Sequence, residues 1–331
     1  MSAVSDIPQT KGWRLSPGAT QALRCPACRC GLEFQDDEIS CTGPSCGKVY
    51  PVVDGIPVLI DDVGSVFSLN DFTARRGTFY QSSETGARQS ISRLLPSLGD
   101  NLKAKGNFLR FAGLLRRSTA SPKVLVVGGS RVGPGLESIL SDPQIDFVES
   151  DVALGQRTAL ICDAHGLPFD DETFDAVVAQ VVLEHVVDPY ACVEEMRRIL
   201  KPGGLVYAET PFMEQVHAGR YDFTRFTRLG HRRLFRGFEE ISSGIVGGPG
   251  MALAWSYRYF LLSFAESRRL RTLLSAFARL TAFWLKYFDP YLTSKAGALD
   301  AAAEFYFMGR KSDRLLADRE LIRSYKGLMD Q

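Results

Sequence analysis

The chain has 331 residues, of which 45% are hydrophobic and 23% charged, and its formal net charge at pH 7 is +1. That length suffices for one large domain and a small one, and the near-neutral balance excludes a whole-chain preference for polyanions. The first ten residues are polar, and the longest apolar stretches are short for a membrane span. We therefore expect a cytoplasmic protein.

Five of the seven cysteines lie within a short N-terminal segment. Four of them form two close pairs, Cys25 with Cys28 and Cys41 with Cys46. Pairs of thiolates at this spacing are typical of tetrahedral zinc sites, and clustered cysteines without an export signal favour a metal over disulfides. These four residues are the predicted ligands, and Cys30 is a competing one.

The segment CGKVYPVVDGIPVLI, which begins at Cys46, resembles the small zinc ribbon of tRNA methyltransferase activator proteins. The resemblance implies a zinc-ribbon domain over residues 20–62 that holds a structural Zn²⁺. Residues 1–62 contain eight acidic and five basic side chains, a balance that disfavours binding to nucleic acid.

Residues 63–120 predict a helical linker and cap. From residue 123 onward, apolar strand-like runs alternate with helical segments, which indicates an α/β fold with a doubly wound sheet. A long segment at about 250–300 predicts a helical insertion before the last strand, and residues 313–331 form a C-terminal tail. The seven predicted strands are Lys123–Val127, Asp146–Glu149, Ala159–Cys162, Ala176–Gln180, Leu205–Glu209, Glu239–Ile245 and Glu304–Arg310.

The segment Ile161–Pro211 contains the motifs LPF, FD, EH and KPGG in this order, after an acid at the end of a strand. It resembles the second half of class I S-adenosylmethionine-dependent methyltransferases, in the type 11 branch. The resemblance implies a seven-stranded Rossmann-like domain over residues 121–312, S-adenosyl-L-methionine as cofactor, and methyl transfer as the reaction.

The same resemblance implies a cofactor site at the carboxyl ends of the strands. The glycine-rich loop departs from the family pattern, because Val126 stands where an acid is common and Ser130 and Val132 replace glycines. By resemblance, an acid after the second strand binds the ribose hydroxyls; Asp151 fits this role, with Glu149 as the alternative. The implied cofactor residues are Gly128, Gly129, Ser130, Gly133, Asp151, Val152, Asp163, Ala164, Gln180, Val181 and His185.

The segment after the fifth strand is expected to bind the acceptor. His217 is the candidate general base, because the ordinary pKa of histidine suits proton transfer near neutral pH. A structural, hydrogen-bonding role for this histidine is the competing interpretation. Tyr221, Asp222 and Arg225 are the candidate substrate contacts.

The expected acceptor is a small molecule, such as the hydroxyl group of a sugar, glycolipid or secondary metabolite. Two alternatives are an RNA base methyltransferase and a non-catalytic binding or partner-activating module. Apolar residues at helical spacing in the 250–300 insertion favour packing on the core or on a second copy of the chain in a homo-oligomer. A membrane-surface contact beside Arg268, Arg269 and Arg271 is the less favoured interpretation.

Overall fold

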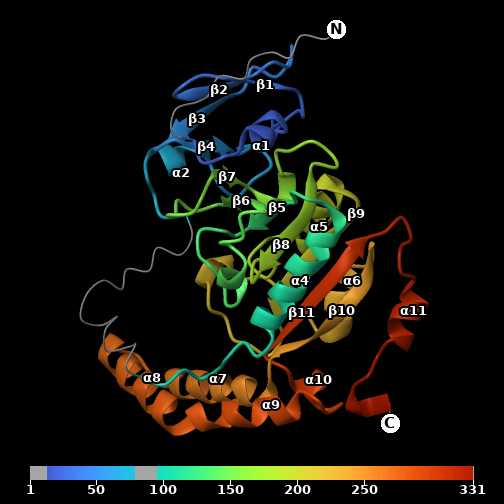
Figure 1. The fold of residues 1–331 in the computed structure, drawn as a ribbon. Coiled ribbons are helices and arrows are strands. Elements are labelled where there is room, and N and C mark those ends of the chain that lie inside the picture. Colours follow the sequence, from blue (N-terminus) through green and yellow to red (C-terminus); the bar gives the residue numbers. More distant parts are fainter. Residues whose placement is uncertain (1–12, 79–94, 331) are drawn as a thin grey trace.

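The computed structural model describes residues 13–78 and 95–330 (Figure 1). Its strands form one mixed sheet in the order β1-β2-β3-β4-β7-β6-β5-β8-β9-β11-β10. Parallel pairing runs from β4 to β9, and β11 is antiparallel to both of its neighbours. The strands are β1 (Leu32–Phe34), β2 (Glu38–Cys41), β3 (Val49–Val53), β4 (Ile56–Leu59), β5 (Lys123–Val127), β6 (Asp146–Asp151), β7 (Leu160–Cys162), β8 (Phe174–Gln180), β9 (Leu200–Pro211), β10 (Phe238–Gly247) and β11 (Glu304–Lys311).

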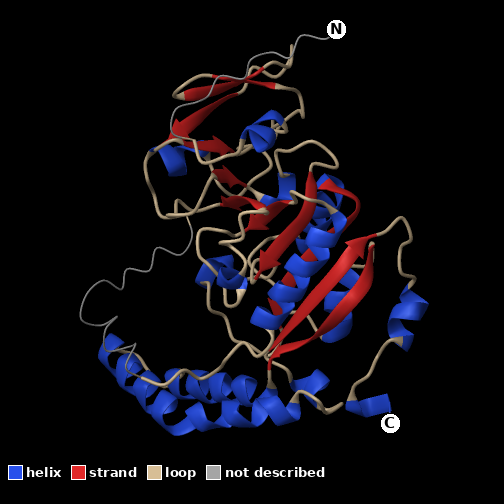
Figure 2. Ribbon diagram, in the orientation of Figure 1, coloured by secondary structure: helices blue, strands red, loops and turns tan. Residues whose placement is uncertain are grey.

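Helices cover both faces of the sheet and extend below it (Figure 2). The α-helices are α1 (Pro17–Gln21), α2 (Leu69–Thr73), α4 (Ala104–Ser118), α5 (Pro189–Ile199), α6 (Arg228–Leu234), α7 (Pro249–Leu262), α8 (Arg268–Ala282), α9 (Asp289–Leu292), α10 (Ala298–Ala301) and α11 (Asp318–Arg323). The 3₁₀ helices are η1 (Leu136–Ser138), η2 (Ala164–Gly166), η3 (Gly219–Tyr221), η4 (Phe283–Phe288) and η5 (Leu328–Asp330).

Alternation along the central strands divides the core in two. In β5, Val124 and Val126 pack on the same side as α4, whereas Leu125 and Val127 pack on the side of α5. Side chains of a strand point alternately to its two faces, so a strand that is apolar on both must be covered on both. Helix α5 begins at Pro189, and its N-terminal amides are capped by the Asp188 carboxylate.

The N-terminal module is joined to the central sheet. The sequence predicts seven strands in this sheet and a separate ribbon, whereas the described chain forms an eleven-stranded sheet because β4 pairs in parallel with β7. All four residues of β4 are buried, and β7 has three residues. Without β4, strand β7 would be the edge of the central sheet and would expose unpaired backbone N–H and C=O groups. The hydrogen bonds from β4 pair these groups.

The predicted linker of residues 63–120 contains two described helices, α2 and α4. Residues 79–94 of that segment lie outside the described residues. Phe108, Phe111 and Leu115 recur at helical spacing along α4 and are buried against the sheet.

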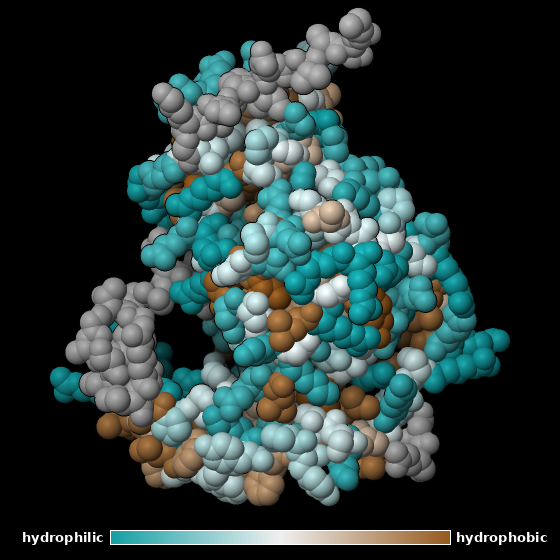
Figure 3. All heavy atoms as spheres, in the orientation of Figure 1, coloured by the Kyte–Doolittle hydropathy of each residue, from teal (hydrophilic) through white to brown (hydrophobic). Residues whose placement is uncertain are grey.

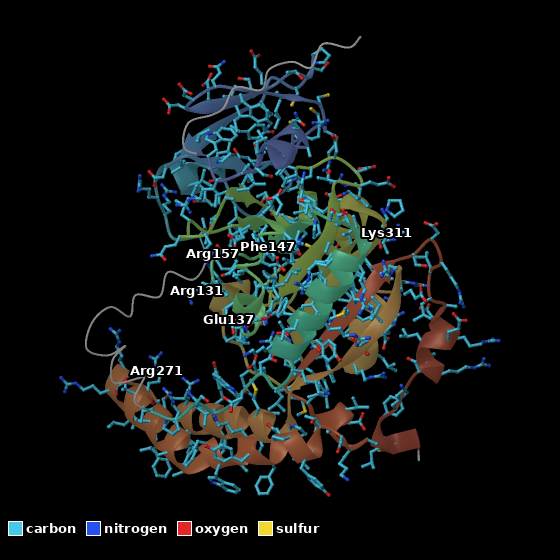
Figure 4. All side chains as sticks on the ribbon, viewed as in Figure 1. Arg131, Glu137, Phe147, Arg157, Arg271 and Lys311 are labelled. Carbon is cyan, nitrogen blue, oxygen red and sulfur yellow. The ribbon has the colours of Figure 1, made fainter. Side chains whose placement is uncertain are left out.

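The segment between β10 and β11 is helical, and α7 and α8 lie side by side at the lower edge of the molecule (Figure 1). Arg271 lies toward the free end of this pair (Figure 4). Large apolar side chains are exposed here, including Phe260, Leu273 and Tyr287, and apolar patches are visible on the surface (Figure 3). Within residues 13–78 and 95–330, no helix is both long and apolar enough to cross a membrane.

Candidate functional site

The carboxyl ends of β5, β6, β7 and β8 open onto a cavity of about 370 Å³. This volume lies within the range usual for small-molecule sites. Ten of the eleven predicted cofactor residues line it, together with His217. These ten are Gly128, Ser130, Gly133, Asp151, Val152, Asp163, Ala164, Gln180, Val181 and His185.

The loop after β5 requires glycine at several positions, because neighbouring side chains lie too close to leave room for a Cβ atom. Gly128 has φ +77°, and a Cβ there would lie 2.5 Å from the Cγ2 of Val182. A Cβ on Gly133 would lie 2.0 Å from the Oε1 of Gln180. Gly129 does not line the cavity; it packs against the side chain of Glu149, 2.9 Å from where its own Cβ would be. The altered loop therefore keeps glycine where side chains would collide.

Asp151 and Glu149 have different surroundings. Asp151 lines the cavity, and its carboxylate accepts hydrogen bonds from the backbone amides of Ser130 (2.8 Å) and Ala153 (3.0 Å). Glu149 does not line the cavity, and its carboxylate pairs with Arg157 at 2.5 Å. Burial raises the pKa of Asp151 against the opposing effect of the Ser130 hydrogen bonds. The geometry thus favours Asp151 as the acid that faces a ligand.

Asp163 also lines the cavity and is held by groups from two regions. One oxygen accepts from the amide of His165 (3.0 Å) and lies 2.6 Å from its ring Nδ1, and the other accepts from the Ser65 hydroxyl. Burial by itself raises the pKa of Asp163, but the hydrogen bonds from His165 and Ser65 outweigh it and hold the pKa below its ordinary value. The carboxylate is therefore charged and fixed in orientation at neutral pH.

The backbone at the end of β8 is strained where it meets the cavity. Val181 has φ +55°, a conformation that is rare for a β-branched residue, and its amide donates to the carbonyl of Glu209 (3.0 Å). The side-chain amide of the neighbouring Gln180 donates to the Glu209 carboxylate (2.8 Å) and to the carbonyl oxygen of Pro134 (2.9 Å). Strain held by such contacts is typical of ligand sites.

Two histidines meet on the cavity wall although they are far apart in the sequence. His185 and His217 are perpendicular, with ring centroids 4.8 Å apart, and their Nε2 atoms lie 3.2 Å from each other. Nδ1 of His185 lies 2.9 Å from the carbonyl oxygen of Tyr221. Burial, followed by the nearby His217, lowers the pKa of His185 to about 4, and burial also lowers the pKa of His217. Both rings are therefore neutral at pH 7.

The predicted acceptor contacts occupy different places. Asp222 is buried and pairs with Arg225, whose guanidinium also donates to the carbonyl oxygens of Glu214 (2.8 Å) and Gln215 (3.0 Å). Asp222 and Arg225 do not line the main cavity; they line a second hollow beside it. Tyr221 stacks on Phe67, with ring centroids 5.7 Å apart. These residues position the His217 segment.

Sequence reasoning missed the contribution of the linker and of one buried acid. Val66 and Phe67 line the cavity, and Ser65 holds Asp163. These three follow the ribbon without a recognisable motif, so nothing local indicated their role. Glu184 is fully buried next to His185, and burial raises its pKa to about 8. A single acid within an apolar run, VVLEHVV, was the available signal.

The four predicted zinc ligands converge in the N-terminal module. The sulfur atoms of Cys25, Cys28, Cys41 and Cys46 all lie within 4.8 Å of one another, with Cys25 to Cys46 at 3.7 Å and Cys28 to Cys41 at 3.4 Å. Tetrahedral zinc with Zn–S bonds of about 2.3 Å places its sulfur ligands about 3.8 Å apart. Cys30 is not part of this cluster. The donor set fits zinc.

Comparison with known proteins agrees with this architecture. Residues 139–208 match the family model of a methyltransferase domain; the matched range begins after the glycine-rich loop. The mixed α/β sheet and this match identify a methyltransferase fold.

The chain is 27% identical over 184 residues to a ubiquinone/menaquinone biosynthesis C-methyltransferase from Desulfotalea psychrophila, covering 55% of this chain and 65% of that protein. It is 37% identical over 93 residues to a demethylmenaquinone methyltransferase from Staphylococcus epidermidis, covering 24% and 39%. It thus spans less than two thirds of either relative. Among solved structures, the Haemonchus contortus phosphoethanolamine N-methyltransferase 2 in complex with S-adenosyl-L-methionine matches with a TM-score of 0.39 and 17% identity, over 65% of this chain and 55% of that one.

Proposed function

We propose that the protein is an S-adenosylmethionine-dependent methyltransferase that acts on a hydroxyl-bearing small molecule. The observation that carries this proposal is the cavity itself. Two fixed carboxylates, Asp151 and Asp163, stand at its cofactor end, and two neutral histidines, His185 and His217, stand on its wall beside the acceptor segment.

In this proposal, Asp151 accepts hydrogen bonds from the ribose hydroxyls, and Asp163 with the amide of Ala164 binds the adenine ring. The backbone of Gln180 and Val181 runs close to the methionine portion of the bound cofactor. The bound cofactor supplies an electrophilic methyl group on sulfur. The protein then has to align the acceptor atom with that methyl group, exclude water and remove a proton from the acceptor hydroxyl.

The proton acceptor in this proposal is His217. Its ring is neutral and lines the cavity, and it therefore has a lone pair to offer to a hydroxyl proton. The direct product is an O-methyl group. A second candidate is methyl transfer to carbon, the reaction of the C-methyltransferase from Desulfotalea psychrophila to which the chain is similar. Deprotonating a hydroxyl on an aromatic ring would activate its carbon atoms as well, so the same histidine serves both reactions.

We also propose that the four-cysteine cluster holds a structural Zn²⁺. The module is small, and Ile39 is the one buried residue of β1 and β2, so a metal supplies folding energy to this part of the module. With four protein ligands the site is closed, which suits a structural role.

Calorimetry with S-adenosylmethionine tests the cofactor assignment. We expect wild type to bind, and Asp151→Ala to lose affinity by about 10- to 100-fold, the usual effect of removing a charged hydrogen-bond partner. Glu149→Gln is the matched control and should keep its affinity, since Glu149 faces Arg157. Absence of binding by wild type would overturn the proposed function, and equal losses in both variants would overturn the assignment to Asp151.

A further inference from the structure

Glu184 lies in the turn after β8 and is fully buried beside the two histidines. Neither of its carboxylate oxygens accepts a hydrogen bond from any residue in the described ranges. Its own carbonyl accepts from the amides of Phe223 (2.8 Å) and Thr224 (3.2 Å), which fix the turn against the acceptor segment. A buried carboxyl group without hydrogen bonds is costly, so its retention needs an explanation.

The three side chains converge on one point. The Oε1 of Glu184 lies 3.5 Å from the Nε2 of His185 and 3.8 Å from the Nε2 of His217, and the two Nε2 atoms are 3.2 Å apart. Ligand atoms bound to a tetrahedral cation at about 2.0–2.1 Å lie about 3.3–3.4 Å from one another. The observed triangle has the size that one shared cation requires.

The other ring nitrogens are held by backbone oxygens. The Nδ1 of His185 lies 2.9 Å from the carbonyl oxygen of Tyr221, and the Nδ1 of His217 lies 3.3 Å from that of Gln215. A metal-binding histidine typically donates its second N–H to a carbonyl or carboxylate, which fixes the tautomer and directs the other nitrogen at the metal. Both histidines have this arrangement.

The surrounding charges favour a cation. Besides Glu184, the carboxylates of Glu214 and Asp222 lie 3.7 Å and 3.8 Å from the Nδ1 of His217. One guanidinium, that of Arg225, pairs with Asp222. Three carboxyl groups thus face one guanidinium across this cluster.

We propose that Glu184, His185 and His217 bind a divalent transition-metal ion, such as Zn²⁺, Fe²⁺ or Mn²⁺. Two imidazoles and one carboxylate on one side of the ion suit these metals and leave coordination positions open. Because both histidines line the cavity, those positions face the space where an acceptor would lie.

The role of the ion rests on the proposed function. The acceptor hydroxyl binds the ion, which lowers the pKa of that hydroxyl, and its proton leaves to water. The resulting oxygen anion attacks the methyl carbon; the new O–C bond forms as the C–S bond breaks, and the electron pair of that bond stays on sulfur. In this form His217 is a ligand and does not accept the proton itself.

The test is the metal stoichiometry of the full-length protein. After loading with Zn²⁺ and removal of loosely bound metal, we expect about two equivalents per chain by elemental analysis, one in the cysteine cluster and one here. His217→Ala, whose side chain is partly exposed, and Glu184→Gln should each retain about one. His165→Asn is the matched control, because that histidine also lines the cavity but pairs with Asp163, and it should keep about two.

Titration with Co²⁺ of wild type and variants that hold Zn²⁺ in the cysteine cluster alone provides a second measurement, since nitrogen and oxygen ligands give visible absorption without sulfur charge-transfer bands. Wild type with a single, cysteine-bound equivalent would overturn the metal site, and so would a His217→Ala variant that retains both. Cofactor binding is measured on the same samples. Two equivalents without cofactor binding would contradict the proposed function and leave the metal site standing, and the reverse pattern would do the opposite.

Discussion

Within residues 13–78 and 95–330, two groups of side chains are arranged so that each could hold a metal ion, and they differ in where their ligands come from and in their access to the cavity. The cysteine cluster takes its four potential ligands from residues 25–46, and these would fill all four positions of a tetrahedral ion. The Glu184–His185–His217 cluster takes its ligands from two loops and opens onto a cavity. A closed site stabilises a fold, whereas an open one can bind a substrate.

The two clusters are also linked to each other through side-chain packing. The cysteine module attaches to the sheet through β4, and the linker that follows it contributes Phe67 to the cavity wall, where the ring stacks on Tyr221. Tyr221 in turn positions His185 through its carbonyl oxygen. The segment after the cysteine cluster therefore packs against the Glu184–His185–His217 cluster, and the two clusters share no ligand.

The largest expected effect is that of Cys25→Ser. Structural zinc contributes on the order of 10 kcal/mol to folding, which is comparable to the whole stability of a domain. We expect the variant to lose its cysteine-bound zinc and hydrogen-exchange protection over residues 32–60, with weaker protection of β7. Cys30→Ser should retain both, and a Cys25→Ser protein with normal zinc content would contradict the ligand assignment.

Chelation should separate the two clusters. A mild chelator is expected to remove the ion of the open cluster first, because three protein ligands hold it and the cavity gives access. The thermal unfolding temperature should change little at that stage and fall steeply once the cysteine-bound ion is removed. Simultaneous loss of both ions, followed by elemental analysis, would argue against a difference in accessibility.

A smaller effect is expected from Phe67→Leu. Phe67 and Phe72 belong to the same buried cluster, but only Phe67 lines the cavity. Phe67→Leu and the matched variant Phe72→Leu should each lower the free energy of unfolding by about 1 kcal/mol. Only Phe67→Leu should also weaken cofactor binding, by about 3- to 10-fold in calorimetry, as expected for loss of one aromatic contact. Equal cofactor affinities of the Phe67→Leu and Phe72→Leu variants would show that Phe67 does not shape the cofactor site.

An effect confined to acidic pH is expected from a histidine that belongs to neither cluster. His231 packs among Phe226, Phe235 and Phe307, and burial lowers its pKa to about 3. The unfolded chain, where the pKa of histidine is about 6.5, then takes up a proton that the native state refuses. Stability from this group is therefore present above pH 6.5 and is lost as the pH falls toward 3.

His231→Phe should remove that loss. Between pH 6 and pH 4, the free energy of unfolding of wild type should fall more steeply than that of the variant, by about 1.4 kcal/mol per pH unit. Urea denaturation at several pH values measures the slopes. Parallel slopes would mean that His231 is protonated in the native protein, and would remove the contrast between a packed histidine and the two at the cavity.

Much of the fold followed from local patterns. Continuous apolar runs located β5 and β8. The cysteine pairs were visible because their ligands are adjacent in the chain. The pairing of β4 with β7 was not visible, since a buried apolar strand reads the same whether it closes a small domain or extends a large sheet.

By itself, the sequence determined the type of sheet, the residues at its carboxyl edge and the cysteine cluster, because each depends on spacing within one element or one turn. Only the tertiary structure decided that Asp151, not Glu149, faces the cavity, and that the linker brings Ser65 to Asp163 and Phe67 to the cavity wall. It also brought His217 to the Glu184–His185 pair across more than thirty residues. The physical reason is that burial and convergence depend on the packing of distant segments, which no local pattern records.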